Sequence, residues 1–164
     1  MLNSDDFKVH DQMVHKVKNN LIEIAYTSHA QAPLSIEALA EVLKQARNFN
    51  TYNNITGLLL YKDGSFFQVL EGPAETVEYL YQKIKRDLRH DKVKTLYQRP
   101  LAKRNFLDWA MLFHDISNFE SDGITPKMQD LPGYLPFDCP ETAFDEWIKP
   151  SVAKVLIEAF RHHA

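Results

Sequence analysis

Residues 50–72 carry the clearest structural signal in this sequence, a pair of apolar runs separated by a short polar segment. Two apolar runs, at 55–61 and 66–70, flank the polar segment Lys-Asp-Gly-Ser at 62–65. Asp-Gly between apolar runs is a strong signal for a β-hairpin, because these residues suit the tight turn between adjacent strands. Side chains alternate along a strand, so Gln68 would share a face with the apolar residues two places before and after it. An unpaired buried amide costs about 1–3 kcal/mol, so Gln68 is predicted to have a specific hydrogen-bonding partner.

The composition is typical of one soluble globular domain. The chain has 164 residues, of which 45% are hydrophobic and 25% charged, and its net charge is -3. One domain with a small appendage is therefore expected, and nothing favours nucleic acid as a partner. No apolar run approaches the roughly 18 residues of a membrane helix and no signal segment is apparent, so we expect a cytoplasmic protein without a membrane partner. The single cysteine, Cys139, excludes an internal disulfide and has no ligand set beside it for a metal site.

A strand and two helices are expected around the hairpin. Residues 21–27 place large apolar side chains at every second position, which predicts a strand with Tyr26 at its C-terminal end. A helix is expected at 35–48, where Ser35 suits the N-cap and apolar residues recur at helical spacing. A second helix is expected to open at Pro73. Its end is basic, with Lys83, Lys85, Arg86, Arg89 and His90.

Two further strands complete the expected domain. They are predicted at 93–99 and 106–114, the second with Leu107, Trp109, Met111 and Phe113 on a single face. The element order is then βαββαββ. Two helices with one apolar stripe each would cover one face of a mixed sheet, which is an α+β sandwich of ferredoxin-like type.

The two ends of the chain differ in character from this central part. Residues 1–20 form an N-terminal extension, residues 21–115 the domain, and residues 116–164 a proline-rich linker followed by C-terminal helices. Helix is expected from about Asp138, with a break at Pro150. The final helix would present the amphipathic face Val152, Val155, Leu156, Ala159 and Phe160.

Familiar catalytic motifs are missing. The sequence contains no Gly-x-Ser-x-Gly elbow and no glycine-rich phosphate loop, so no enzymatic activity is expected. Tyr26, Asn50 and Gln68 are nevertheless a notable set near the apolar strands. Each has an ordinary structural explanation, but an amide donates and accepts at once and suits the edge of a planar heterocycle such as isoalloxazine. The apolar helix faces, with Val42 and Ile84, could hold such a ring.

These residues lie within a recognisable pattern. The segments IAYTS, NNITGLLLY, FFQVLEG, RDLRH and NFLDWAM occur in order between residues 21 and 114. In this stretch the chain resembles the BLUF domains, a family of flavin-binding blue-light sensors, and it resembles their short, single-domain members. The resemblance implies a flavin cofactor, FAD or FMN. It leaves residues 1–20 and 115–164 without a counterpart.

The resemblance also implies roles for individual residues. Tyr26 would be the photo-oxidised tyrosine, and Gln68 would lie between it and the flavin. Asn50 would bind the flavin carbonyl edge. Phe49 occupies a flavin-side position where many members carry asparagine or histidine. Arg89 and His90 would lie near the ribityl-phosphate tail, and Trp109 and Met111 would relay the signal.

The implied function is that of a blue-light photoreceptor. Light would drive proton-coupled electron transfer from Tyr26, after which Gln68 keeps an altered hydrogen bond. The change would pass through the last strand and the C-terminal helices to a partner protein or to the chain's own oligomer. Two alternatives stay open at this point: a flavin-dependent oxidoreductase, and a cofactor-free ferredoxin-like interaction module.

Overall fold

The computed structural model describes residues 20–32, 34–106, 110–115, 134–135 and 151–163. Within these ranges no helix is both long and apolar enough to cross a membrane. The elements are, in chain order, β1 (Leu21–Ala30), α2 (Ile36–Tyr52), β2 (Thr56–Lys62), β3 (Ser65–Pro73), α3 (Ala74–Lys85), β4 (His90–Leu101), β5 (Leu112–Asp115), β6 (Tyr134–Leu135) and α6 (Val152–His163).

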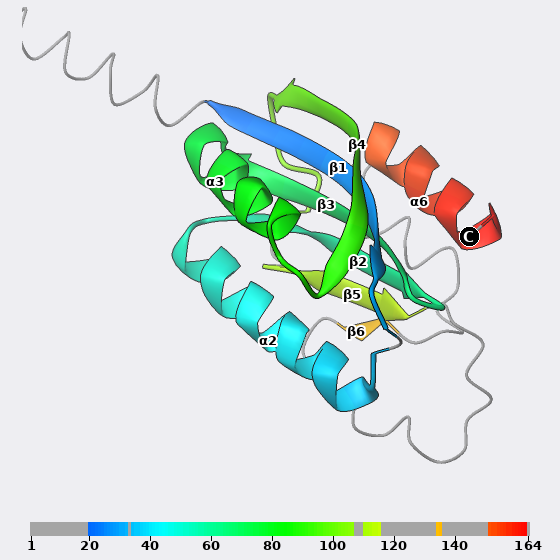
Figure 1. Ribbon diagram of the computed structural model, residues 1–164. Helices are drawn as coiled ribbons and strands as arrows, with labels where there is room; N and C mark the ends of the chain where they lie inside the picture. The colour runs from blue at the N-terminus through cyan, green and yellow to red at the C-terminus, as the bar shows by residue number, and fades with distance from the viewer. Residues whose placement is uncertain (1–19, 33, 107–109, 116–133, 136–150, 164) are drawn as a thin grey trace, which may run out of the picture.

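The strands form one mixed sheet in the order β4-β1-β3-β2-β5-β6 (Figure 1). The first four strands pair antiparallel, whereas β5 pairs parallel with β2 and β6 pairs parallel with β5. The order of the first four strands, in which β1 and β3 are central, is the one that a ferredoxin-like βαββαβ chain adopts. The predicted fold class is therefore confirmed.

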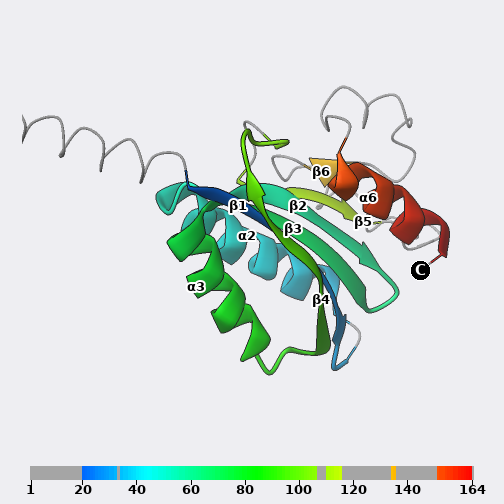
Figure 2. The same ribbon diagram turned by 90° about the horizontal axis from the view of Figure 1, so that it is seen from above.

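Helices cover both faces of this sheet. α2 and α3 lie on one face and α6 lies on the other, as the view from above shows (Figure 2). Two separate apolar clusters result, because side chains alternate between the faces along each strand. One contains Ile24, Tyr26 and Leu70 with residues of α2 and α3, and the other contains Phe67 and Val69 with residues of α6.

The central hairpin forms as expected. Asp63 and Gly64 have φ values of 46° and 85°, the positive angles that a two-residue hairpin turn requires. A glycine is also needed within β2. A Cβ on Gly57 would lie 2.0 Å from the carbonyl oxygen of Val69, so the backbones of β2 and β3 approach too closely there for any side chain.

Helices α2 and α3 differ from prediction at their C-terminal ends. Ser35 caps α2 by accepting a hydrogen bond from the Ala38 amide, as expected, but the helix continues beyond residue 48 to Tyr52. The α3 helix ends at Lys85, so Arg89 and His90 are not part of it. Asp87 explains this early end, because its carboxylate accepts a hydrogen bond from the Arg89 amide at 2.9 Å and offers the backbone an alternative to helix.

Three strand predictions also need correction. The strand predicted at 93–99 is longer at both ends, since β4 begins at His90 and ends at Leu101. β1 extends to Ala30, so Tyr26 lies at its middle and not at its end. The strand predicted at 106–114 begins only at Leu112. The amides of Asn105 and Phe106 donate to the side chain of Glu71, and these two residues therefore do not extend the strand. Residues 107–109, with Trp109, lie outside the described residues.

The final helix buries a different face from the predicted one. Ala153 and Ile157 are buried against the sheet, with Leu156 and Phe160 packed beside them. Val152 and Val155 are instead 46% and 64% exposed, and Ala159 is also exposed. The ring of Phe160 packs against Phe67 of β3 with a centroid separation of 5.7 Å, and this contact selects the buried face. The helix predicted from Asp138 and the extension at 1–19 lie outside the described residues.

Candidate functional site

A cavity of about 340 Å³ lies between α2, α3 and the sheet. This volume is in the range of about 300–1,000 Å³ found for small-molecule sites. Most of the lining surface is apolar, and polar or charged side chains make up about half of the lining residues. The lining residues used below are Tyr26, Ser28, Val42, Gln45, Phe49, Asn50, Gln68, Lys83, Ile84, Asp87, Arg89 and His90.

Tyr26 and Gln68 form a buried pair beneath this cavity. They are direct partners in the register of β1 and β3, so their side chains emerge next to each other on the same face. The Tyr26 hydroxyl donates a hydrogen bond to Oε1 of Gln68. Burial, and then the neighbouring Tyr81 and Asp87, raise the pKa of the Tyr26 phenol above its ordinary value. Tyr26 is therefore a neutral donor at physiological pH.

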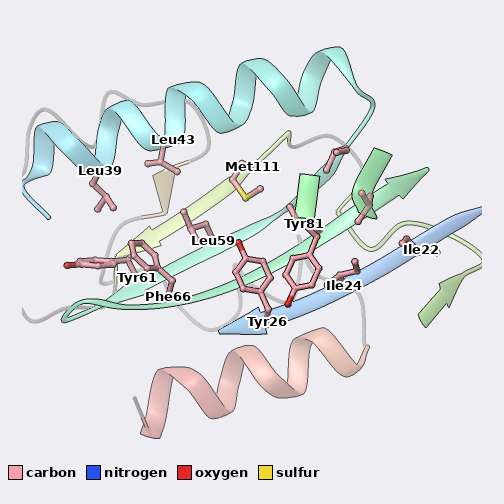
Figure 3. Packing of buried hydrophobic residues seen from close by; sticks show 13 residues of the cluster. Ile22, Ile24, Tyr26, Leu39, Leu43, Leu59, Tyr61, Phe66, Tyr81 and Met111 are labelled. Carbon is pink, nitrogen blue, oxygen red and sulfur yellow. The ribbon is translucent and has the colours of Figure 1, made fainter. Parts of the chain in front are cut away.

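Met111 accepts a hydrogen bond from the nitrogen of the Gln68 amide. Nε2 of Gln68 donates to the Met111 sulfur at 3.4 Å, and Met111 is only 1% exposed. Figure 3 shows Met111 and Tyr26 projecting into the same layer between α2 and the sheet. A thioether sulfur is a weak acceptor, so the amide keeps capacity for a stronger partner.

Tyr81 supports the pair from α3. Its ring lies 5.1 Å from the Tyr26 ring, measured between centroids, and Figure 3 shows the two rings side by side. The Tyr81 hydroxyl pairs with Thr95 at 2.7 Å and does not interact with Gln68. Tyr81 therefore fixes the position of the Tyr26 ring without entering its hydrogen-bonded chain.

Asn50 joins α2 to the segment that carries Met111. Its Nδ2 donates to the carbonyl oxygen of Ala110 at 2.6 Å, and Nε of Arg47 donates to the Met111 carbonyl at 3.1 Å. Oδ1 of Asn50 is buried and has no hydrogen-bonding partner among the described residues. An orphaned acceptor that lines a cavity indicates that a ligand supplies the missing donor.

Asp87, Arg89 and His90 line the cavity from the turn after α3 and from the start of β4. Arg89 is held by Asp87 in an ion pair with an N–O distance of 2.5 Å, and this contact lowers the pKa of the Asp87 carboxyl. His90 is half-buried, its Nδ1 has no partner in the described part of the chain, and burial lowers its pKa. The Arg89 guanidinium is already paired with the Asp87 carboxylate. An anionic group of a ligand would therefore compete with Asp87 for Arg89.

The structure brings together all eight residues that the sequence nominates for the cofactor. Tyr26, Val42, Phe49, Asn50, Gln68, Ile84, Arg89 and His90 all line this one cavity. That they contact a flavin stays a prediction. Of the two nominated relay residues, Met111 contacts Gln68, whereas Trp109 is outside the described residues.

The sequence interpretation did not nominate four polar lining residues as cofactor contacts: Ser28, Gln45, Lys83 and Asp87. The ammonium of Lys83 lies 5.5 Å from the Phe49 ring centroid, and Phe49 stacks on Tyr79 at 6.5 Å. Helical spacing could have indicated Gln45, which lies three residues after Val42 and four before Phe49 on the same face. No local pattern indicates that Asp87 pairs with Arg89 beside a cavity.

The donors and acceptors of the cavity match the edge of a flavin. The ring edge alternates carbonyl acceptors with an N–H donor, and the cavity offers both an unpaired acceptor, Asn50 Oδ1, and a weakly used donor, Gln68 Nε2. Val42, Phe49 and Ile84 supply apolar surface for a flat ring. The residues present therefore fit this cofactor.

Comparison with known proteins agrees with this fit. The family model described as "BLUF: Sensors of blue-light using FAD" matches residues 21–112. The photoactivated adenylate cyclase subunit beta of Euglena longa is 36% identical over 139 residues, which are 84% of this chain and 16% of that protein. The chain therefore spans about one sixth of the length of that relative.

Solved structures give the same result. The photo-activated state of BlsA is 35% identical, with a TM-score of 0.56, and the match covers 58% of this chain and 69% of that chain. BlrP1 of Klebsiella pneumoniae, solved with FMN and cyclic diGMP, is 28% identical with a TM-score of 0.68, and the match covers 87% of this chain and 35% of that chain. The fold, the cavity and these similarities together place this chain in the BLUF family of flavin-binding blue-light sensors.

Proposed function

We propose that Tyr26 and Gln68 are the photochemical switch of this sensor and that Met111 receives its output. The observation that carries the proposal is the continuous chain from the Tyr26 hydroxyl through the Gln68 amide to the Met111 sulfur, next to the cavity. A flavin bound there supplies blue-light absorption and, when excited, an oxidising centre.

Tyr26 is suited to lose an electron and a proton together. Because burial raises its pKa, loss of the proton alone is unfavourable. Its hydrogen bond to Gln68 Oε1 provides the path by which the proton leaves and returns. The same burial keeps water from the pair, since Tyr26 is 3% and Gln68 7% exposed.

Rearrangement of Gln68 has a definite consequence for Met111. If the amide rotates, Oε1 takes the place of Nε2 beside the sulfur. Two acceptors cannot hydrogen-bond, so the 3.4 Å contact between Nε2 and the sulfur is lost and Met111 must repack. Since Met111 immediately precedes β5, the change reaches the sheet beside β2.

The remaining lining residues would hold the cofactor. Asn50 would bind a donor of the ring edge through Oδ1, and Val42, Phe49 and Ile84 would contact the ring itself. His90 and Arg89 would lie by the phosphate tail, where Arg89 must exchange its partner Asp87 for the phosphate.

The chain would act as a sensor without catalytic activity of its own, in the cytoplasm, and would signal to a separate protein or to a second copy. Its match to the cyclase subunit covers only 16% of that protein. We propose residues 21–115 as the sensor, residues 1–20 as an extension, and residues 116–164 as the linker and helices that pass the signal on.

Absorption spectroscopy before and after blue light tests this function. The purified chain should be yellow and should show a reversible shift of the flavin band. Tyr26→Phe should abolish the shift while flavin stays bound. Tyr81→Phe is the matched control, since it removes a buried hydroxyl that bonds Thr95 and not Gln68, and it should keep the shift.

Other outcomes would point elsewhere. Sustained consumption of NADH would support a flavin-dependent oxidoreductase. A protein that stays colourless after refolding with excess flavin would support a cofactor-free interaction module. A normal shift in Tyr26→Phe would contradict the proposed switch.

A further inference from the structure

Two buried glutamates face each other on the side of the sheet opposite the cavity. Glu23 of β1 and Glu71 of β3 are direct register partners, and both are 0% exposed. Carboxyl groups are seldom fully buried unless they are paired, because their charged form is costly to desolvate. The switch described above uses neither of them.

Each glutamate has a full set of partners. Glu23 accepts hydrogen bonds from the Tyr97 hydroxyl at 2.7 Å and from Nε of Arg99 at 2.9 Å. Glu71 accepts from the backbone amide of Asn105 at 2.9 Å, and from that of Phe106 at 3.1 Å. Nδ2 of Asn105 bridges the two carboxyl groups, at 2.8 Å from Glu23 and 2.7 Å from Glu71.

The two carboxyl groups lie close together, since one side-chain nitrogen, Nδ2 of Asn105, bonds to both of them. Two negative charges buried side by side disfavour each other, so the pair is favoured with one proton on it. Burial, and then the contact with Glu23, raise the pKa of Glu71 to about 7. Burial acts in the same direction on Glu23, but hydrogen bonds from Glu71, Tyr97 and Arg99 outweigh it and lower its pKa. Glu71 is therefore the proton carrier of the pair.

Among the described residues, few other charges surround the pair. β4 contributes Tyr97 and Arg99, and Arg104 donates to the backbone carbonyl of Glu71 at 2.9 Å. Helix α6 presents Ala153 and Ile157 to the same face, which are apolar. A second negative charge on the pair would thus meet one directly bonded guanidinium, that of Arg99, and a mostly apolar environment.

The pair is linked to the switch along two routes. Glu71 follows Gln68 by three residues on β3. Phe106, whose amide Glu71 holds, precedes Met111 by five residues, and Met111 is held from the other side by Arg47 and contacts Gln68. The carboxyl pair therefore holds Asn105 and Phe106, and Arg47 and Gln68 contact Met111, on either side of residues 107–109, which lie outside the described residues.

We propose that Glu71, with Glu23, is a proton-regulated positioning site that holds the segment entering β5 and thereby sets the lifetime of the light-induced state. With the shared proton in place, Asn105 and Phe106 are anchored and Met111 is kept against Gln68. When the proton is lost, the two carboxylates repel each other, and Glu71 shifts away from Glu23 together with the Asn105 and Phe106 amides that it binds. The inference rests on the proposed switch, because the lifetime is read from the flavin.

Dark recovery measured across pH tests the inference. After a blue flash, the full-length flavin-bound chain should recover about fivefold more slowly at pH 8 than at pH 6, roughly the effect of one buried hydrogen bond on a rate. Glu71→Gln should remove this dependence and keep the wild-type rate of pH 6. Glu75→Gln, the same change at an exposed glutamate of α3, should keep the wild-type profile.

Three results would overturn the inference. The first is a wild-type rate that does not vary between pH 6 and 8, and the second is a Glu71→Gln profile equal to that of the wild type. The third needs no variant: the infrared band of a protonated carboxylic acid in the wild type must titrate near pH 7, and its absence contradicts the shared proton. A chain without any light-induced shift would refute the proposed function itself, whereas a switching chain with a flat profile refutes this inference alone.

Discussion

The side chain of Asn50 has two roles, a structural one through Nδ2 and a proposed ligand-binding one through Oδ1. Replacement of Asn50 by alanine removes both, and separate assays of stability and flavin affinity measure each. Its Nδ2 donates to the Ala110 carbonyl at 2.6 Å, whereas its Oδ1 is buried without a partner among the described residues. In the flavin-free protein Asn50→Ala removes only the Nδ2 bond and leaves the Ala110 carbonyl unsatisfied. We expect a loss of about 1–3 kcal/mol in the free energy of unfolding, measured by urea denaturation.

Flavin affinity should fall in addition. Oδ1 gains its partner only from the ligand, so the dissociation constant should rise by roughly tenfold or more, corresponding to about 1.4 kcal/mol or more. Fluorescence quenching of the flavin measures this constant. Asn53→Ala is the matched control, since Asn53 Nδ2 also donates to a backbone carbonyl, that of Phe49 at 2.8 Å, but Asn53 does not line the cavity.

The control should lose stability and keep its affinity. An Asn50→Ala protein that is destabilised as calculated but binds flavin with the wild-type constant would refute the role assigned to Oδ1. Equal losses of affinity in both variants would show that the effect passes through helix α2 and not through the ligand.

Three further predictions concern stability. Gly57→Ala should destabilise the protein by about 1–3 kcal/mol or more in urea denaturation, because its Cβ meets the Val69 carbonyl oxygen at 2.0 Å; an unchanged midpoint would contradict the close approach. Phe160→Ala should cost about 1–3 kcal/mol through loss of its contact with Phe67, while flavin affinity stays the same, and a change in affinity would show that α6 acts on the cavity directly. The raised pKa of Glu71, about 7 in the folded chain against an ordinary 4.5, stabilises the fold fully below pH 4.5, and this contribution is lost as pH rises to about 7. The unfolding free energy of the wild type should fall over that pH interval by on the order of 3 kcal/mol, and that of Glu71→Gln should fall by less. An identical pH dependence of the unfolding free energy in both proteins would argue against the raised pKa of Glu71.

Local patterns were sufficient to predict the elements that build the cavity. Neighbouring residues decide the Asp-Gly turn, the alternation of side chains along β3 and the cap at Ser35. The hairpin and α2 therefore follow from the sequence. The alternation of side chains along β3 also places Gln68 on the face of the sheet that α2 and α3 cover. Tyr26 and Gln68 therefore reach the same cavity, whereas Phe49, Arg89 and His90 are nominated by the family resemblance and not by a local pattern.

Contacts between distant parts of the chain could not be predicted in this way. β5 begins late because Asn105 and Phe106 bond to Glu71, more than thirty residues earlier in the chain. Glu23 and Glu71 look like ordinary strand residues until the register of β1 and β3 brings them together. The buried face of α6 likewise depends on Phe67, because several apolar stripes of that helix could serve equally well.

The light-minus-dark absorption spectrum of Gln68→Leu is the decisive test of the switch formed by Tyr26 and Gln68. Leucine keeps much of the buried volume but removes both the acceptor for the Tyr26 hydroxyl and the donor to Met111. The variant should bind flavin and absorb blue light, yet show no reversible shift of the flavin band under illumination that shifts the wild type. A normal, reversible shift in Gln68→Leu would contradict the account.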